Sequence, residues 1–401
     1  MTETRLSDVS AWRRRLAVAG HYGIVLGAGL PGTIGTVVSS VYLITVVGAD
    51  PLVVGLFANA GTILGMLVTY YAGRGRIDQR SPVAIIVWSM SIALVATVLL
   101  LLAPVTLWVL VLVVLLRALT NLLSPAIYMF DERYRPPLAD ENAGMYYTRL
   151  VISMVWIVGP PVGFFVFWIG EYPLITLVSG VLTVLACAAV LYVAATRQPH
   201  AAPTKAAAKP VVAGARPAMD RWQVFTIMVC VTAANVLHSM AMPLYQLQQL
   251  GAEPYWPGFN MAVAASTEVV VIYCIPILLK RTTEEVLLRI GLGIGLVYFL
   301  LLFVVRSPVP ILFMQVIYGA HFALSTVVCL GLLKTATQQK IGAVAAQFLN
   351  AGKLGGLIGA SIFGLFAARL SFGGVLSDFG LALIVAAAVL ALVVSQRRVV
   401  A

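Results

Sequence analysis

Twelve long apolar runs constrain this chain more than any other feature. Most of them reach the roughly 20 helical residues that cross a hydrocarbon core of about 30 Å. At 61% hydrophobic and 10% charged residues, the 401-residue chain carries more apolar surface than a soluble protein could bury. We therefore predict an all-α membrane protein with twelve transmembrane helices, at about 17–47, 51–73, 82–102, 105–129, 144–168, 173–195, 221–248, 255–280, 287–305, 308–334, 340–368 and 372–396.

The basic residues gather on one side of these predicted helices. With the N-terminus inside, 21 of the 26 Lys and Arg residues fall in cytoplasmic segments, and only Arg306 and Arg369 fall in outer loops. Since such a bias sets membrane orientation, both termini are expected in the cytoplasm. The bias also accounts for the net charge of +11, so no nucleic-acid partner is expected.

A ten-residue stretch occurs twice in related form. Gly48–Phe57 and Gly251–Asn260 are offset by 203 residues, and each copy begins with Gly-Ala-acid-Pro between two apolar runs. An Ala-, Pro- and Lys-rich segment between the sixth and seventh runs has the composition of a linker. The sequence therefore predicts two pseudo-symmetric six-helix bundles, 1–195 and 221–401, joined by a cytoplasmic linker at 196–220.

Polar residues are distributed unevenly among the runs. The third, sixth, ninth and twelfth have no ionisable residue in their central regions, so we expect them to form an outer scaffold around the polar ones. This 6+6 layout resembles that of the major facilitator superfamily, and the resemblance implies two halves that rock about a site at the membrane midplane.

Glu268 is the sharpest candidate for chemistry. It lies near the middle of the run 255–280, where an ionised carboxylate costs on the order of a few kcal/mol. It should therefore be protonated, paired or facing water, and such a carboxyl suits proton coupling. The alternative is a fixed ion pair with Lys353 or Arg117. His238 is a second proton-coupling candidate, although an interhelical hydrogen bond is the commoner role for such a histidine.

Three cations lie within the runs, namely Arg117, Arg149 and Lys353. Set against one central acid, they leave a positive surplus that favours an anionic substrate group. Alternatively, Arg149 extends to the cytoplasmic face and Arg117 bonds to backbone carbonyls. Asp131 and Glu132 follow the fourth run at its cytoplasmic edge, where we predict an interhelical charge cluster or gate latch.

The fifth run contains Gly159, Pro160 and Pro161. Consecutive prolines kink a helix, and a glycine admits a close neighbour. A similar Gly-Pro element is associated with the antiporter branch of the superfamily, while an ordinary kink in a packed helix is the alternative. The chain contains no P-loop, catalytic triad or HExxH motif, so we expect no enzyme, cofactor or metal.

Short motifs of one family run through most of the chain. They are Val47–Pro51 with Gly55–Phe57, Asn121 with Pro125, Arg149 with Trp156–Pro161, Asn235 with Met242–Leu244, Gly258–Phe259 with Glu268 and Lys280–Arg281, and Gly342–Ala343 with Asn350. On these residues the chain resembles the sugar efflux transporter family of bacterial facilitator proteins.

The resemblance implies proton-driven export of small sugars, with Asn121, Arg149, Asn235, Glu268 and Asn350 around a central cavity. Amides suit a hydroxyl-rich ligand because they both donate and accept hydrogen bonds. The chain departs from the family in having alanine at position 241, where an acid precedes the Met-Pro pair of the seventh run. That departure places more weight on the glutamate of the eighth run.

The leading hypothesis is a secondary active transporter that exports sugars or related small polar solutes by proton antiport and alternating access. Its expected substrate-binding residues are the three amides together with Arg117, Arg149 and Lys353. We expect a monomer in the inner membrane of a bacterium, whose partners are a small molecule, protons and the lipid bilayer. A multidrug, toxic-metabolite or organic-anion exporter of the same fold is the alternative; a non-transporting receptor and an importer also stay open.

Overall fold

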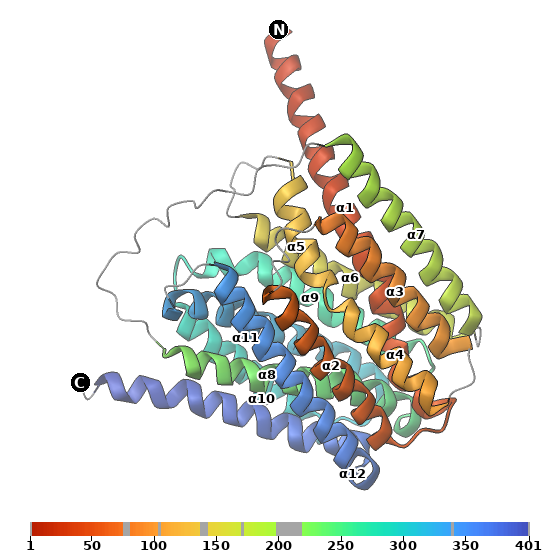
Figure 1. The fold of residues 1–401 in the computed structure, drawn as a ribbon. Helices are drawn as coiled ribbons and strands as arrows, with labels where there is room; N and C mark the ends of the chain where they lie inside the picture. The colour runs from red at the N-terminus through yellow and green to blue at the C-terminus, as the bar shows by residue number, and fades with distance from the viewer. Residues whose placement is uncertain are drawn as a thin grey trace.

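Helices make up the computed structural model, which describes residues 2–74, 81–102, 106–136, 143–169, 172–197, 219–337 and 341–399 (Figure 1). No strand occurs in these ranges, and most of the expected linker at 196–220 lies outside them. The elements are α1 (Thr2–Thr45), α2 (Pro51–Arg74), α3 (Pro82–Leu102), α4 (Leu107–Thr120), α5 (Leu123–Tyr134), α6 (Ala143–Trp168), α7 (Tyr172–Thr196), α8 (Arg221–Leu244), η2 (Tyr245–Gln249), α9 (Trp256–Leu278), α10 (Glu284–Leu301), α11 (Pro308–Thr337) and α12 (Ile341–Val399).

The twelve predicted membrane crossings can all be found in this helix order. Within the described residues, 9 segments are long and apolar enough to span a membrane by length and composition. One of them, in α12, provides two crossings, because the helix is interrupted at Ser371, whose φ is 70°. The other two crossings are α10, whose first turn carries Glu284 and Glu285, and the pair α4–α5.

The fourth predicted helix is divided at Asn121 and Leu122. The Asn121 side chain donates from Nδ2 to the carbonyls of Arg117 (3.2 Å) and Ala118 (3.1 Å). These carbonyls lie in the last turn of α4, where a helix leaves backbone acceptors without partners. The amide therefore stabilises the end of α4, a local role that the sequence did not indicate.

The repeated stretch forms the same turn twice. Gly48 and Gly251 both have positive φ, 70° and 62°, a conformation that glycine adopts without strain. The Ala49 amide then donates to the Leu43 carbonyl at 2.8 Å, six residues back, and in the second copy the Ala252 amide donates to the Gln246 carbonyl at 2.9 Å. The duplicated sequence thus ends the first long helix of each half.

The helices form two groups that pack along one another (Figure 1). We call α1–α7 the first half and α8–α12 the second half. Between the halves, α2 packs on α12 and α6 packs on α9, while α1 and α8 touch less extensively. These three contacts place a seam of six helices at the centre of the molecule.

Glycines allow the two halves to approach closely. A Cβ atom on Gly55 of α2 would lie 2.7 Å from the Ala360 carbonyl oxygen of α12. A Cβ atom on Gly258 of α9 would lie 2.8 Å from Cα of Pro161 in α6. Gly55 and Gly258 are equivalent residues of the repeated stretch, so the duplication also explains why both contacts lie at the same end of the molecule.

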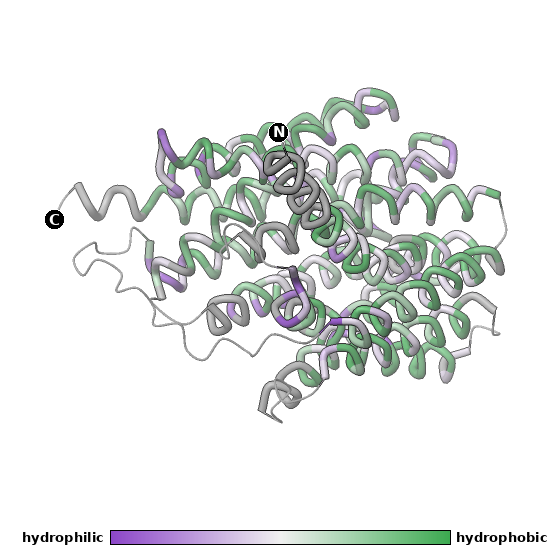
Figure 2. Tube along the Cα trace, turned by 90° about the horizontal axis from the view of Figure 1, so that it is seen from above, coloured by the Kyte–Doolittle hydropathy of each residue, from purple (hydrophilic) through white to green (hydrophobic). Residues whose placement is uncertain are grey.

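The outer surface of the helices is apolar, as expected for contact with lipid. Figure 2 shows hydrophobic residues along most of the helical length. Large exposed side chains include Trp88, Trp108 and Phe313, at 70%, 80% and 70% exposure. A protein with such a surface and this succession of apolar helices is a multi-pass membrane protein.

Candidate functional site

A cavity of about 260 Å³ lies between α6 of the first half and α8, α9 and α11 of the second. Aromatic and small apolar side chains make up much of its wall, with a few polar groups among them. It is lined by Ser153, Trp156, Asn235, His238, Ser239, Met261, Ala264, Ala265, Glu268, Tyr318, Gly319 and Phe322. An apolar cavity with few, convergent polar groups is typical of small-molecule sites.

Glu268 lies in the wall formed by α9 and is 8% exposed. Its helix is held tightly against α11, because any side chain at Gly319 would collide with the Ala264 carbonyl. The carboxyl group therefore belongs to a rigid wall rather than to a loop. Asn235 and His238, two of the other predicted site residues, line the same cavity from α8.

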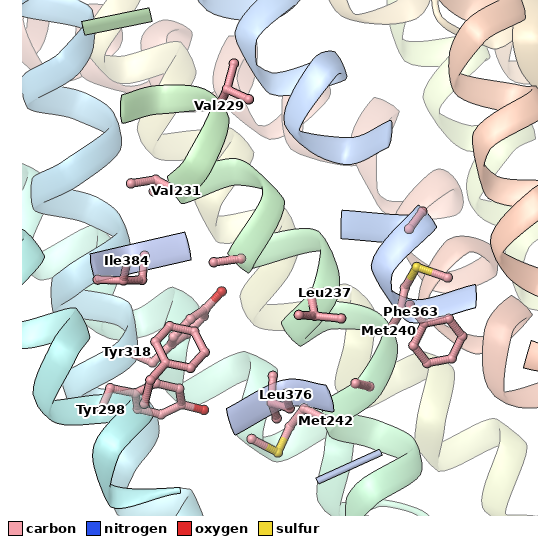
Figure 3. Close-up of a cluster of buried hydrophobic side chains, with 14 of the residues drawn as sticks. Val229, Val231, Leu237, Met240, Met242, Tyr298, Tyr318, Phe363, Leu376 and Ile384 are labelled. Atoms are coloured by element: carbon pink, nitrogen blue, oxygen red, sulfur yellow. The ribbon is translucent and has the colours of Figure 1, made fainter. Parts of the chain in front are cut away.

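Tyr318 of α11 joins Asn235 and His238. Its hydroxyl donates to Asn235 Oδ1 at 2.7 Å. Its ring stacks on the His238 imidazole, with centroids 3.9 Å apart and planes 12° from parallel. On the other side, His238 Nε2 shares a 2.7 Å hydrogen bond with the Tyr298 hydroxyl of α10. Figure 3 shows the two tyrosine rings beside α8.

The network ends at Gln315, whose Nε2 donates to the Tyr298 hydroxyl at 3.3 Å. Gln315, Tyr298 and Tyr318 were missed by sequence reasoning. Gln315, Tyr318 and Phe322 recur every three to four residues along α11, and this helical spacing of polar and aromatic side chains was the available signal. Tyr298 gave no such signal, since its polar atom is at the tip of an otherwise apolar ring.

Two of the three predicted intramembrane cations, Arg117 and Lys353, lie elsewhere. Arg117 Nη2 donates to Ser39 Oγ of α1 at 2.7 Å, and its guanidinium lies 5.5 Å from the centroid of the Phe57 ring. Lys353 of α12 reaches across to the Gly65 carbonyl of α2, at 3.4 Å from Nζ. Neither cation lines the cavity described above.

Two of the three predicted amide ligands also lie away from this cavity. Asn121 packs against Gly65 and bonds to the carbonyls of α4, and Asn350 is exposed. The structure therefore brings Asn235, His238 and Glu268 together and does not bring Asn121, Asn350, Arg117 or Lys353 to them. The Arg149 side chain lies outside the described residues.

Asp131 connects two helices of the first half. Its Oδ1 lies 3.0 Å from His21 Nε2 of α1, and Arg135 Nη1 donates to Oδ2 at 3.0 Å. Both carboxylate oxygens are thus engaged in a nearly buried cluster, in which His21 also stacks on the Phe130 ring. The side chain of Glu132 lies outside the described residues.

The Gly-Pro-Pro element lies at two contacts of α6. Gly159 faces Thr33 of α1 so closely that a Cβ atom would collide with the threonine side chain. Pro160 and Pro161 face Gly258 of α9 across the junction of the halves. Among the described residues, no group of three or more His, Cys, Asp or Glu side chains could hold a metal ion.

Comparison with known proteins gives both family and fold. The family model described as Major Facilitator Superfamily matches residues 21–360. Sugar efflux transporter C of Escherichia coli (strain K12) is 20% identical over 359 residues, which cover 89% of this chain and 91% of that protein. Sugar efflux transporter A of Dickeya chrysanthemi is 23% identical over 346 residues, covering 86% and 87%.

Solved transporters share the fold at low identity. A bacterial homolog of the human lysosomal transporter Spinster, in an inward-facing and unoccupied conformation, aligns with a TM-score of 0.66 at 15% identity over 96% of this chain and 95% of its own. A peptide transporter solved with sulfate aligns with a TM-score of 0.71 at 14% identity over 95% and 94%. The chain belongs to the major facilitator superfamily of membrane transporters.

Proposed function

We propose that this transporter exports sugars or related small polar solutes from the cytoplasm of a bacterium in exchange for protons. The observation that carries the proposal is the cavity in which Asn235, Glu268 and Trp156 meet. An amide and a carboxyl bind hydroxyl groups, and an aromatic ring offers a flat surface to the apolar face of a sugar. The relatives named sugar efflux transporters support the same substrate class.

The distribution of basic residues supports an orientation with both termini in the cytoplasm, so that the duplicated turns face outward. The glycine contacts of α2 with α12 and of α9 with α6 follow these turns directly. Contacts gathered at the outer end support an inward-facing arrangement. In this scheme the bundles 1–195 and 221–401 rock against each other, and the segment 196–220 links them in the cytoplasm.

Proton exchange requires a group that is accessible from each side in turn. Glu268 suits this role because it is a carboxyl group in the wall of the cavity, near the middle of the apolar helix α9. When the outer end opens, the carboxylate takes a proton from outside and solute leaves. When the inner end opens, the proton passes to the cytoplasm and new solute binds. His238 lines the same cavity and is the second candidate for carrying this proton.

Replacing Glu268 by glutamine tests the coupling. In proteoliposomes with an imposed pH gradient, Glu268→Gln should exchange labelled sugar for unlabelled sugar but should not accumulate it against its gradient. The matched control is Glu253→Gln, which changes an exposed glutamate of the outer turn and should leave accumulation intact. Accumulation by Glu268→Gln at the wild-type level would refute the proton-coupling role.

A second candidate, export of organic anions, is favoured by Arg117. Within the described part of the chain, no carboxylate lies within 4.0 Å of this guanidinium, whose partners are a serine and an aromatic ring. A cation within a membrane bundle is commonly paired or functional. A thermal-shift screen of sugars, sugar phosphates, organic anions and drugs separates the candidates, because stabilisation by anions alone, lost in Arg117→Gln, would select the second.

A further inference from the structure

The amide of Asn235 has two chemically different ends, and the structure assigns one of them to a protein partner. The Tyr318 hydroxyl donates to Oδ1 at 2.7 Å. An amide oxygen accepts and an amide nitrogen carries two N–H donors. Oδ1 thus has its orientation set by Tyr318, while Nδ2 has no hydrogen-bond partner among the described residues and keeps both of its donors for a ligand in the cavity that Asn235 lines.

The donor on Tyr318 is itself held in place by three helices. Its ring stacks on His238 of α8, at 3.9 Å between centroids, and lies 4.9 Å from the Tyr298 ring of α10. Tyr298 bonds to His238 and accepts from Gln315, which lies one helical turn before Tyr318 on α11. A hydroxyl mounted on such a ring has little freedom to turn away from the amide.

A buried tyrosine could serve packing alone, and Tyr318 is 5% exposed within a cluster of apolar side chains. A phenylalanine would then serve as well. The hydroxyl, however, is directed at an amide of the cavity wall, and it donates to the only acceptor atom of that amide. Packing does not explain that choice of partner.

We propose that Tyr318 is a positioning residue that fixes the orientation of the Asn235 amide. The cavity then presents N–H donors at this point and selects ligands that place an acceptor oxygen or fluorine there. The ligand class, sugars, rests on the function proposed above. Without the Tyr318 hydroxyl the amide can turn over, and the preference for an acceptor at this point should be lost.

Binding of mono-substituted sugars tests the proposal. The probes are glucose and galactose in which one hydroxyl is replaced by fluorine or by hydrogen. Fluorine can accept a hydrogen bond but cannot donate one, and a hydrogen on carbon can do neither. For the ring position that Asn235 contacts, wild-type protein should bind the fluoro sugar about tenfold more tightly than the deoxy sugar, as one hydrogen bond provides. Tyr318→Phe should reduce this ratio to about one, measured by titration calorimetry on detergent-purified protein.

Tyr245→Phe is the matched control. It removes the hydroxyl of another buried tyrosine, whose partners are the Val305 carbonyl and Arg306 rather than groups of the cavity wall, so the fluoro-to-deoxy ratio should stay at the wild-type value. If sugars bind and Tyr318→Phe keeps that ratio, the proposal is overturned while the transport function stands.

A double-mutant cycle on thermal stability tests the bond between Tyr318 and Asn235 without any ligand. Asn235→Ala and Tyr318→Phe should each lower the unfolding midpoint of the empty protein, and the double variant should lose less than the sum of the two shifts. Additive shifts would overturn the proposal. If no sugar binds any variant, the proposed function fails, and the cycle still tests the bond between the two side chains.

Discussion

Buried polar side chains in this protein are joined from helix to helix. His21 of α1 meets Asp131 of α5, His238 of α8 meets Tyr298 of α10, and Tyr318 of α11 meets Asn235 of α8. Lipid offers no hydrogen bonds, so such a group must find its partner inside the protein. Each pair therefore fixes the rotation of two helices as well as satisfying two side chains.

Asp131 is predicted to be the most consequential of these residues for stability. Asp131→Ala leaves the fully buried His21 without its acceptor and Arg135 without its ion pair. The free energy of unfolding should therefore fall by about 1–3 kcal/mol. The thermal midpoint of detergent-purified protein measures the change. Asp378→Ala, at an exposed aspartate of α12, is the control, and equal midpoints for both variants would contradict the prediction.

Sequence reasoning identified residues that line the cavity where their chemistry alone made them unusual. Glu268 and Asn235 stand out because a carboxyl or amide is rare in the middle of an apolar run. Tyr318 did not stand out, because tyrosine is common in such runs and its hydroxyl shows its importance only beside its partner. Arg117 and Lys353 were recognised as unusual, but spacing along one helix cannot tell which neighbour a side chain will face.

At the scale of helices, the duplicated stretch has separate tasks at successive positions. Its first glycine, Gly48 or Gly251, ends a helix through positive φ, and the proline three residues later precedes or opens the next. Its last glycine, Gly55 or Gly258, then admits a helix of the other half. The apolar runs predicted where helices lie, but the division at Asn121 could not be read from them, since leucine and other apolar residues continue on both sides.

Gly258→Ala should weaken the outer contact between the halves. The added Cβ would lie 2.8 Å from Cα of Pro161 and 2.9 Å from the Pro160 carbonyl oxygen, and backbone atoms cannot rotate away as a side chain can. Overpacking of this kind costs about 1–3 kcal/mol. The population of the outward-open state should therefore rise, seen as a longer distance between spin labels at Trp108 and Val304, which are 80% and 77% exposed.

Gly61→Ala is the matched control for that experiment, because Gly61 lies within α2 and an added Cβ would have no neighbouring atom within 4 Å. Its label distances should equal those of the wild type. Equal distances in Gly258→Ala as well would show that this glycine does not hold the outer end closed.

At the scale of the molecule, the two halves share one construction but differ in chemistry. Both use the duplicated turn and a glycine contact to the other half. The second half supplies most of the cavity, through α8, α9 and α11, whereas the first contributes Ser153 and Trp156 from α6. A symmetric scaffold with an asymmetric site suits the rocking motion proposed above, because both halves take part in the motion while the ligand binds in one cavity.

A disulfide across the outer contact should stop this motion reversibly. A Cβ atom at Gly364 of α12 would lie 3.5 Å from Cα of Leu52 in α2, close enough for a bond between cysteines at these positions. The four native cysteines, free in the structure, are first replaced by alanine. Oxidised Leu52→Cys/Gly364→Cys protein should then bind sugar from the cytoplasmic side yet transport none, and a reductant should restore transport. Each single cysteine variant is a control and should transport sugar in both the oxidised and the reduced state. Transport by the fully cross-linked protein would mean that the outer contact does not open during the cycle.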